Sequence, residues 1–164
     1  MKNKRIKFVT NAAVIAATYV ILTYVTNLLG LANGAIQCRL SEAMCVLPAF
    51  TPAAVPGLFV GCLLSNVLTG CTLVDIVFGS LATLVGAYGT LLICRKKLNR
   101  FLLSIPPIVS NTVVIPLILK FSYGFNGGLL YFFVTVALGE IISCGVLGML
   151  LFSSLKNKSD YLFK

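Results

Sequence analysis

The sequence predicts an all-α integral membrane protein, a compact bundle of six transmembrane helices, and two observations support that prediction. Of the 164 residues, 59% are hydrophobic and only 10% are charged, whereas a soluble domain carries about 25% charged residues. The apolar stretches also reach about 20 residues, the length of helix that crosses the hydrocarbon of a bilayer. Lipid can cover such a surface, because atoms that face lipid need no charge.

Hydropathy alone marks five helices and leaves a sixth segment, 36–50, in doubt, because it is short and contains Arg39 and Glu42. The charges decide its status, since lysine and arginine gather at the cytoplasmic ends of spans. Basic clusters occur at the N-terminus, over 95–100 and at the C-terminus. With 36–50 as a span, both termini and all three clusters are cytoplasmic, whereas a re-entrant segment puts most of them outside. The expected helices are 8–29, 36–50, 53–70, 73–94, 104–122 and 128–153.

The chain reads as one transmembrane helical domain over residues 1–164, in a multi-pass protein of the cell membrane. We see no linker, repeat or low-complexity tract in the sequence. The basic start followed by an apolar stretch resembles a signal peptide. That stretch, 8–29, is longer than a typical signal-peptide core, so we interpret it as a retained first helix. The sequence contains no GxxxxGK[ST] phosphate loop, and the chain is therefore expected to have no ATPase site of its own.

Composition argues against catalysis, metal binding and nucleic-acid binding. The chain has no histidine, and none of its six cysteines forms a CxxC pair, so we expect no metal and no cofactor. The few acidic residues are too scattered for a catalytic dyad, and no nucleophile has a visible base. The net charge of +9 lies in short clusters beside apolar spans rather than in a nucleic-acid-binding stripe. A disulfide at the outer face remains an open alternative for Cys38 and Cys71.

Acidic residues inside the predicted helices are the strongest functional signal in the chain. Glu42, Asp75 and Glu140 lie in or at the ends of spans, and a charge at the centre of a membrane helix costs about 2.5–3.5 kcal/mol on insertion scales. A polar partner or a polar ligand must offset that cost. The predicted topology brings the polar side chains to a pocket that opens to the outside. The expected pocket residues are Gln37, Arg39, Glu42, Asn66, Asp75, Asn111 and Glu140.

Structural alternatives exist for most of these residues. Arg39 and Glu42 are three positions apart and could neutralise each other on one helix face, or Arg39 could extend to the headgroups. Asp75 could cap the fourth helix, where the dipole favours an anion. Asn66 and Asn111 could be interhelical hydrogen-bond partners without contacting a ligand.

Small residues form a stripe on the first helix. Ala12 with Ala16, and Ala13 with Ala17, have the spacing that lets two helices approach closely in a membrane. The stripe could serve internal packing or docking on another membrane protein. Spacing alone does not choose between these roles.

Three sequence blocks resemble the queuosine-precursor transporter family QueT, which comprises substrate-binding S-components of energy-coupling factor (ECF) transporters. The resemblance runs through QCRLSEAMCVLPAF, which starts at Gln37, then TPAAVPGLFVGCLLSNVLTG and DIVFGSLATLVGAYGT. It is densest over residues 36–90. The first-helix alanines also resemble the motif by which S-components dock on a shared membrane subunit, in one of the two frames.

The resemblance implies a six-helix subunit that binds a 7-deazaguanine, such as queuine or preQ1, from outside. It would deliver the ligand by toppling in the membrane on an ECF module of one transmembrane coupling subunit and two ATPases. The base has N–H donors that suit carboxylates and a carbonyl that suits arginine or an amide. Its ring needs a flat wall, for which the candidates are Phe78, Tyr88 and Tyr131. The alternatives are an S-component for another small vitamin-like solute, a stand-alone permease, and a structural membrane subunit.

Overall fold

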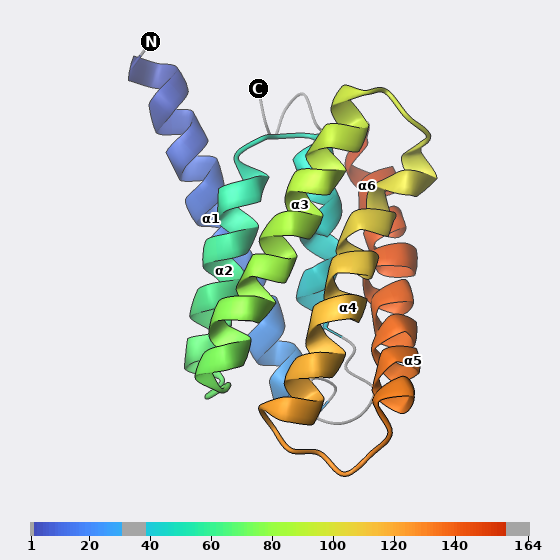
Figure 1. Cartoon of the computed structure of the whole chain (residues 1–164). Coiled ribbons are helices and arrows are strands. Elements are labelled where there is room, and N and C mark those ends of the chain that lie inside the picture. Colours follow the sequence, from blue (N-terminus) through green and yellow to red (C-terminus); the bar gives the residue numbers. More distant parts are fainter. Residues whose placement is uncertain (1, 31–38, 157–164) are drawn as a thin grey trace.

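The computed structural model describes residues 2–30 and 39–156, and in this part of the chain every regular element is a helix (Figure 1). The all-α prediction is therefore confirmed. The elements in chain order are α1 (Lys2–Leu28), η1 (Leu40–Ala49), α2 (Ala54–Leu68), η2 (Asp75–Gly79), α3 (Ser80–Arg95), η3 (Arg100–Ser104), α4 (Ile105–Phe121), α5 (Leu129–Glu140), η4 (Ile141–Leu147) and α6 (Gly148–Lys156).

Several of these elements follow one another directly and make longer rods. Within the described residues, four rods are long and apolar enough to cross a membrane, namely Asn3–Leu28, Asp75–Arg95, Arg100–Phe121 and Leu129–Lys156. The other two apolar segments, Leu40–Ala49 and Ala54–Leu68, are shorter. The structure thus has a helical segment for each of the six that the sequence predicts, but two of them fall short of an ordinary span of about 20 residues.

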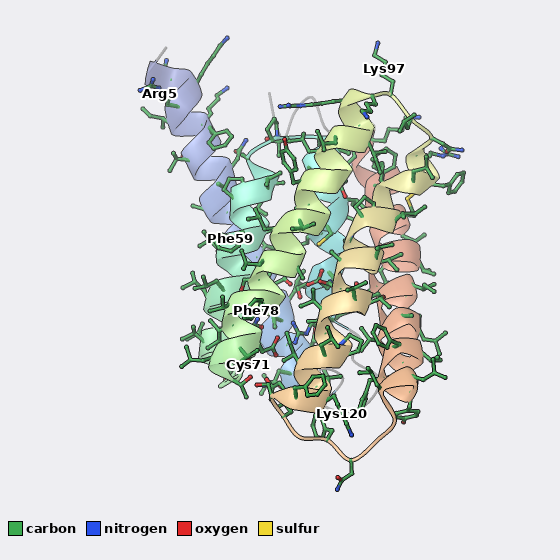
Figure 2. All side chains as sticks on the ribbon, in the orientation of Figure 1. Arg5, Phe59, Cys71, Phe78, Lys97 and Lys120 are labelled. Carbon is green, nitrogen blue, oxygen red and sulfur yellow. The ribbon has the colours of Figure 1, made fainter. Side chains whose placement is uncertain are left out.

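The basic ends of the helices gather at one end of the bundle. Figure 1 places the start of α1, the connection from α3 to η3 and the end of α6 at the same end. Arg5 and Lys97 lie there, whereas Lys120 lies at the opposite end (Figure 2). This grouping is what the positive-inside rule requires of a cytoplasmic end, and a cytoplasmic location for both termini stays a prediction.

Helix α1 packs closely on α2 through glycine. A side-chain carbon added at Gly57 would lie 2.7 Å from the carbonyl oxygen of Ala12, and one added at Gly61 would lie 3.0 Å from that of Ala16. Only glycine leaves room for such an approach, which supplies packing energy where lipid offers no hydrophobic drive. One frame of the alanine stripe is therefore used inside the subunit. The two alanines that the structure leaves exposed are Ala13 and Ala17.

The short η1 segment lies at the centre of the fold, where it contacts α1, α2, α3, η4 and α6. It is a 3₁₀ helix of 10 residues with Pro48 inside it, although such helices rarely exceed three or four residues because their hydrogen bonds are poorly aligned. Side-chain contacts from its neighbours must therefore hold this segment. Ser41, Glu42 and Cys45 are buried on it, so η1 carries polar groups into the middle of the bundle.

Candidate functional site

An amide and two carboxyl groups from three distant segments meet inside the bundle. Glu42 comes from η1, Asn111 from α4 and Glu140 from the end of α5, and they are only 1%, 3% and 6% exposed. The Asn111 side-chain nitrogen donates to Glu42 Oε2 at 3.3 Å and to Glu140 Oε1 at 3.0 Å. One amide therefore links both acids, which supports the prediction that these polar residues share a location.

Three further side chains complete the hydrogen bonding of these acids. The Tyr19 hydroxyl donates to Glu42 Oε1. The Cys45 thiol donates to Glu42 Oε2 at 3.1 Å. The Cys144 thiol lies 3.3 Å from Glu140 Oε2 and 3.2 Å from the Glu42 carbonyl oxygen. These contacts offset the cost of burying a carboxyl group away from water.

Sequence reasoning missed Tyr19 and the two thiols. A cysteine in an apolar helix more commonly serves as a small apolar residue of the core. A usable signal was present, because Cys45 follows Glu42 by three positions and Cys144 follows Glu140 by four. Residues at those spacings share a helix face.

A second polar cluster surrounds Asp75 and lies nearer the end of the bundle that is opposite Lys97. The Tyr123 hydroxyl donates to Asp75 Oδ2 at 3.0 Å, and Arg39 Nη2 lies 3.9 Å from the same oxygen. The Asn66 amide donates to the Asp75 carbonyl oxygen at 3.4 Å. Burial raises the pKa of Tyr123, so the phenol keeps the proton that it donates.

These contacts correct one of the structural alternatives and extend another. Arg39 forms its ion pair with Asp75, so the Arg39–Glu42 pair that their spacing allowed is not the one that the structure contains. Asp75 does lie in the first turn of η2, but its carboxylate is directed at Tyr123 and Arg39. It contributes to a contact between elements as well as to the start of a helix.

A small polar cavity lies between the two clusters. Its lining residues are Arg39, Glu42, Gly79, Thr83, Asn111, Ile115, Val136 and Glu140. The volume of this cavity is about 10 Å³, which is room for roughly one water. A site for a small organic ligand typically holds about 300–1,000 Å³, so the side chains must move apart to admit a base.

Two buried acceptors at this location have no partner among the described residues. They are Asn111 Oδ1 and Asp75 Oδ1. Leaving a buried acceptor unsatisfied costs about 1–3 kcal/mol. A donor supplied by a ligand would recover that energy, so the site is chemically suited to a molecule rich in N–H groups.

The structure separates the predicted residues into those at the cavity and those away from it. Arg39, Glu42, Asn111 and Glu140 line the cavity, and Asn66 and Asp75 adjoin it. Phe78 and Tyr88 are 54% and 51% exposed, and Tyr131 is similarly exposed, so none of the three aromatic candidates faces the cavity. Gln37 and Cys38 lie outside the described residues, and Cys71 is a free thiol.

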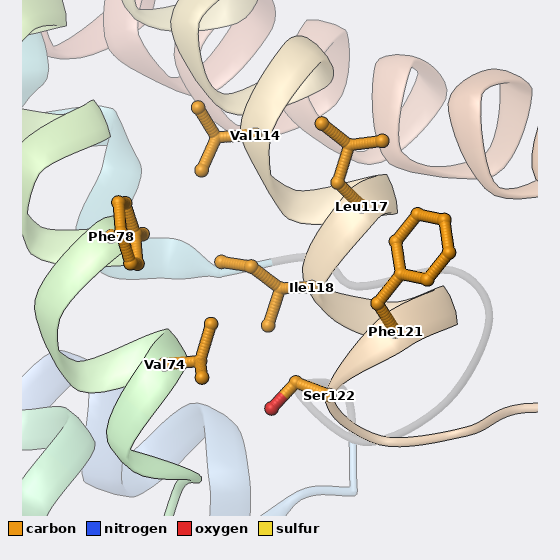
Figure 3. Close-up of a pocket in the computed structure, with 7 residues that line it drawn as sticks. All are labelled: Val74, Phe78, Val114, Leu117, Ile118, Phe121 and Ser122. Carbon is orange, nitrogen blue, oxygen red and sulfur yellow. The ribbon is translucent and has the colours of Figure 1, made fainter.

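A roomier hollow lies on the outer surface, between the start of the η2–α3 rod and the end of α4 (Figure 3). It offers about 350 Å³ and is lined by Val74, Phe78, Val114, Leu117, Ile118, Phe121 and Ser122. Ser122 is its single polar side chain, and that hydroxyl already lies 2.8 Å from the Thr72 hydroxyl. An apolar hollow on the outside of a membrane bundle suits lipid chains, so the polar cavity is the better candidate despite its size.

One buried group has the composition of a metal site. The ligand atoms of Glu42, Cys45 and Cys144 all lie within 4.8 Å of one another. Both thiols, however, already donate hydrogen bonds to acidic or carbonyl oxygens. Hydrogen bonding accounts for their proximity, and we assign no metal to this group.

Comparison with known proteins agrees with the resemblance seen in the sequence. A family model described as "QueT transporter" matches residues 9–157. The curated "Queuosine precursor transporter QueT" of Lactococcus lactis subsp. cremoris (strain MG1363) is 36% identical over 102 residues, which make up 62% of this chain and 60% of that relative. The matched part thus spans less than two thirds of the relative, and no solved structure matches the chain. With four helices able to span a membrane and a family match over most of its length, the chain is an integral membrane protein that belongs to the QueT transporter family.

Proposed function

We propose that this chain is the substrate-binding membrane subunit, or S-component, of an ATP-driven ECF importer for a queuosine precursor. The ligand is a 7-deazaguanine such as queuine or preQ1. Membership of a transporter family argues against an enzyme, and the name of the curated relative supplies the substrate class. The single observation that carries the ligand assignment is the buried, acceptor-rich cluster around Asn111.

The cluster complements the hydrogen-bonding edge of a deazaguanine. The base carries donors at the ring N1–H, the exocyclic amino group and the pyrrole N–H, and it has few acceptors. Glu42 and Glu140 present carboxyl oxygens, and Asn111 Oδ1 is an acceptor that no described residue pairs with. Arg39 is the donor that suits the base carbonyl. Hydrogen bonds between carboxylates and N–H groups are charge-assisted and stronger than neutral ones.

The excess of carboxyl groups around the cavity favours a ligand that carries a positive charge. The carboxyl groups of Glu42, Glu140 and Asp75 lie near a single guanidinium, that of Arg39. An unpaired carboxylate is costly in a low-dielectric interior. The amino substituent of preQ1 or queuine, protonated at neutral pH, would offset the excess of acid, whereas a neutral base would not.

The flat ring also needs apolar contact on its faces. In the closed geometry, the cavity offers Ile115 and Val136 for that purpose. Phe78 and Tyr88 would contribute only if their helix segments turned on binding. We therefore propose aliphatic walls for the ring and leave the aromatic residues outside the proposed first contacts.

ATP hydrolysis requires a partner, since the sequence contains no phosphate-binding loop. The proposed partners are a transmembrane coupling subunit and two ATPases. Ala13 and Ala17 are exposed on α1, whereas Ala12 and Ala16 pack against the glycines of α2. We propose the Ala13–Ala17 frame as the docking face, because only this frame is free to meet another helix.

Uptake measured in cells tests this function and its alternatives together. Labelled preQ1 should accumulate when this chain is expressed with an ECF coupling subunit and its ATPases, and those subunits should copurify with it. Uptake in cells that lack the ATPases would support a stand-alone permease. Copurification without uptake of preQ1 or queuine would support an S-component for another small solute.

A further inference from the structure

Helix α1 presents a row of hydroxyl groups to η1. Tyr19, Thr23 and Thr26 are all buried, and their spacing of four and then three residues places them on one helix face. Buried hydroxyls in an otherwise apolar span need partners to be tolerated. The two threonine hydroxyls contact carbonyl oxygens one turn earlier in α1, those of Tyr19 and Leu22. Three consecutive residues at the start of η1 also lie within hydrogen-bonding distance of the three hydroxyls.

The contacts run in order along both segments. The Tyr19 hydroxyl donates to Glu42 Oε1. The Thr23 hydroxyl donates to the Ser41 hydroxyl at 2.8 Å. The Leu40 backbone N–H donates to the Thr26 hydroxyl at 3.4 Å. We call these three contacts the hydroxyl ladder.

The ladder replaces the local interactions that η1 lacks. Arg39, at the N-cap of η1, makes no side-chain capping hydrogen bond. A 3₁₀ helix of this length is also poorly stabilised by its own backbone. The start of η1, and with it the direction of Glu42, is therefore set by α1.

The two oxygens of Glu42 are held by different helices. Oε1 accepts from Tyr19 on α1, whereas Oε2 accepts from Asn111 on α4 and from Cys45. Glu42 lines the cavity and Tyr19 does not. Tyr19 can therefore influence a ligand only through the carboxylate that it holds.

We propose that Tyr19 is a positioning residue, which directs the Glu42 carboxylate into the cavity and ties that carboxylate to α1. The part of this inference that concerns a ligand rests on the proposed function. A ligand that draws Glu42 toward itself would pull on Tyr19, and so on the helix that carries the exposed Ala13 and Ala17. The ladder thus connects the binding site with the outward face of α1.

A single hydroxyl deletion isolates the role of Tyr19. Tyr19→Phe keeps the fully buried ring in place and removes only the donor to Glu42. Calorimetric titration with preQ1 should show an affinity roughly 10-fold weaker than wild type, as expected when a charged group loses one hydrogen bond. The matched control is Tyr24→Phe on the same helix, where the side chain is 50% exposed, and it should bind like wild type. Unchanged affinity of Tyr19→Phe would overturn the proposal.

A double-mutant cycle distinguishes positioning from a general effect on the fold. If Tyr19 acts through Glu42, the double variant with Glu42→Gln should bind about as weakly as Glu42→Gln alone. Losses that multiply would mean that Tyr19 acts independently of Glu42, and the proposal would then be wrong.

A cycle without ligand separates this proposal from the substrate assignment. The shift in thermal unfolding caused by Tyr19→Phe should largely disappear in a Glu42→Leu background, where no side-chain oxygen remains to accept from Tyr19. If wild-type protein binds neither preQ1 nor queuine, the proposed substrate is wrong, and the ligand-free cycle still decides whether Tyr19 and Glu42 are coupled. Equal shifts in both backgrounds would overturn the coupling.

Discussion

Asn111 brings a donor group and an acceptor group to the cavity on separate atoms of one side chain. Its amide nitrogen donates to both Glu42 and Glu140, while its oxygen has no partner within residues 2–30 and 39–156. An amide can donate on one side and accept on the other. It therefore holds two acids together and still offers an acceptor to a ligand.

Replacing this amide with an acid should destabilise the subunit. Asn111→Asp keeps the shape of the side chain but removes the N–H groups that donate to Glu42 and Glu140. It also places a third carboxyl group beside the two acids. We expect a loss of about 1.5–3 kcal/mol in the free energy of unfolding, seen as a lower midpoint in thermal unfolding of the purified protein. Asn99→Asp is the matched control, since Asn99 is exposed and accepts from the Phe101 N–H, which aspartate also does. Equal midpoints for the two variants would contradict the assigned role of Asn111.

The Asp75 cluster should affect affinity less than the cavity acids do. Asp75→Asn weakens the pairing with Arg39 but leaves Glu42 and Glu140 in place. We expect a loss of affinity for preQ1 that is below about 10-fold, which corresponds to less than about 1.4 kcal/mol. Titration of folded protein measures it, and a loss larger than that of Glu140→Gln would place Asp75 in the primary contact with the ligand.

At the level of elements, α1 has two faces with different surroundings. Its inner face carries Tyr19 and packs on α2 and η1, whereas its outer face exposes Ala13 and Ala17. A stripe of small residues lets another helix approach closely, on whichever face of the helix the stripe lies. The two alanine frames should therefore respond differently to bulky substitution.

The double variant Ala13→Leu with Ala17→Leu should fold and bind preQ1 but fail in uptake, because the larger side chains keep a partner helix away. Ala16→Leu is the contrasting variant. Its side chain would press on the close contact with Gly61, so it should lower the unfolding midpoint of the isolated subunit. Normal uptake by the double variant would exclude this face as the docking surface.

Hydropathy located the helices, but it did not predict which side of each helix faces the interior of the bundle. Phe78 and Tyr88 were candidates for the flat wall of the ring site, yet both lie exposed on the outside of the bundle. A helix that is apolar all round has no polar face to mark its orientation. Rotation about the helix axis is instead decided by packing, such as the contact of α1 with Gly57 and Gly61, which a single sequence does not reveal.

The character of η1 was also beyond a prediction from the sequence. The segment 36–50 was expected to be a span, and the described part is a 3₁₀ helix of 10 residues. Its form depends on contacts with hydroxyl groups of α1, and the residues that carry them lie about 20 positions earlier in the chain. Polar side chains within apolar segments did point to Arg39, Glu42, Asn111 and Glu140, which line one cavity, because isolated polar groups in a membrane need a partner. Their partner Tyr19 carried no such signal, and only the spacing of Cys45 and Cys144 from the acids pointed to the two thiols.

For the whole molecule, the grouping of basic residues at one end predicts the orientation in the membrane. Cysteine substituted at the exposed Asn126, between α4 and α5, should react with an impermeant thiol reagent applied to intact cells. Cysteine at Asn99, between α3 and α4, should not react until the membrane is opened. The background should lack the accessible native cysteines, and Cys45, Cys62 and Cys144 can stay because they are buried. Labelling of Asn99→Cys with Asn126→Cys protected would reverse the proposed topology.

Calorimetric titration of purified protein with preQ1 and queuine tests the central claim most directly. Wild-type protein should bind at least one of them in a 1:1 complex. Glu42→Gln and Glu140→Gln should each bind about 10- to 150-fold more weakly, because an amide presents a donor where the base also has a donor, at a cost of about 1.5–3 kcal/mol. Folded wild-type protein that binds neither compound, or binding that both glutamine variants leave unchanged, would contradict the assignment of this cavity to a queuosine precursor.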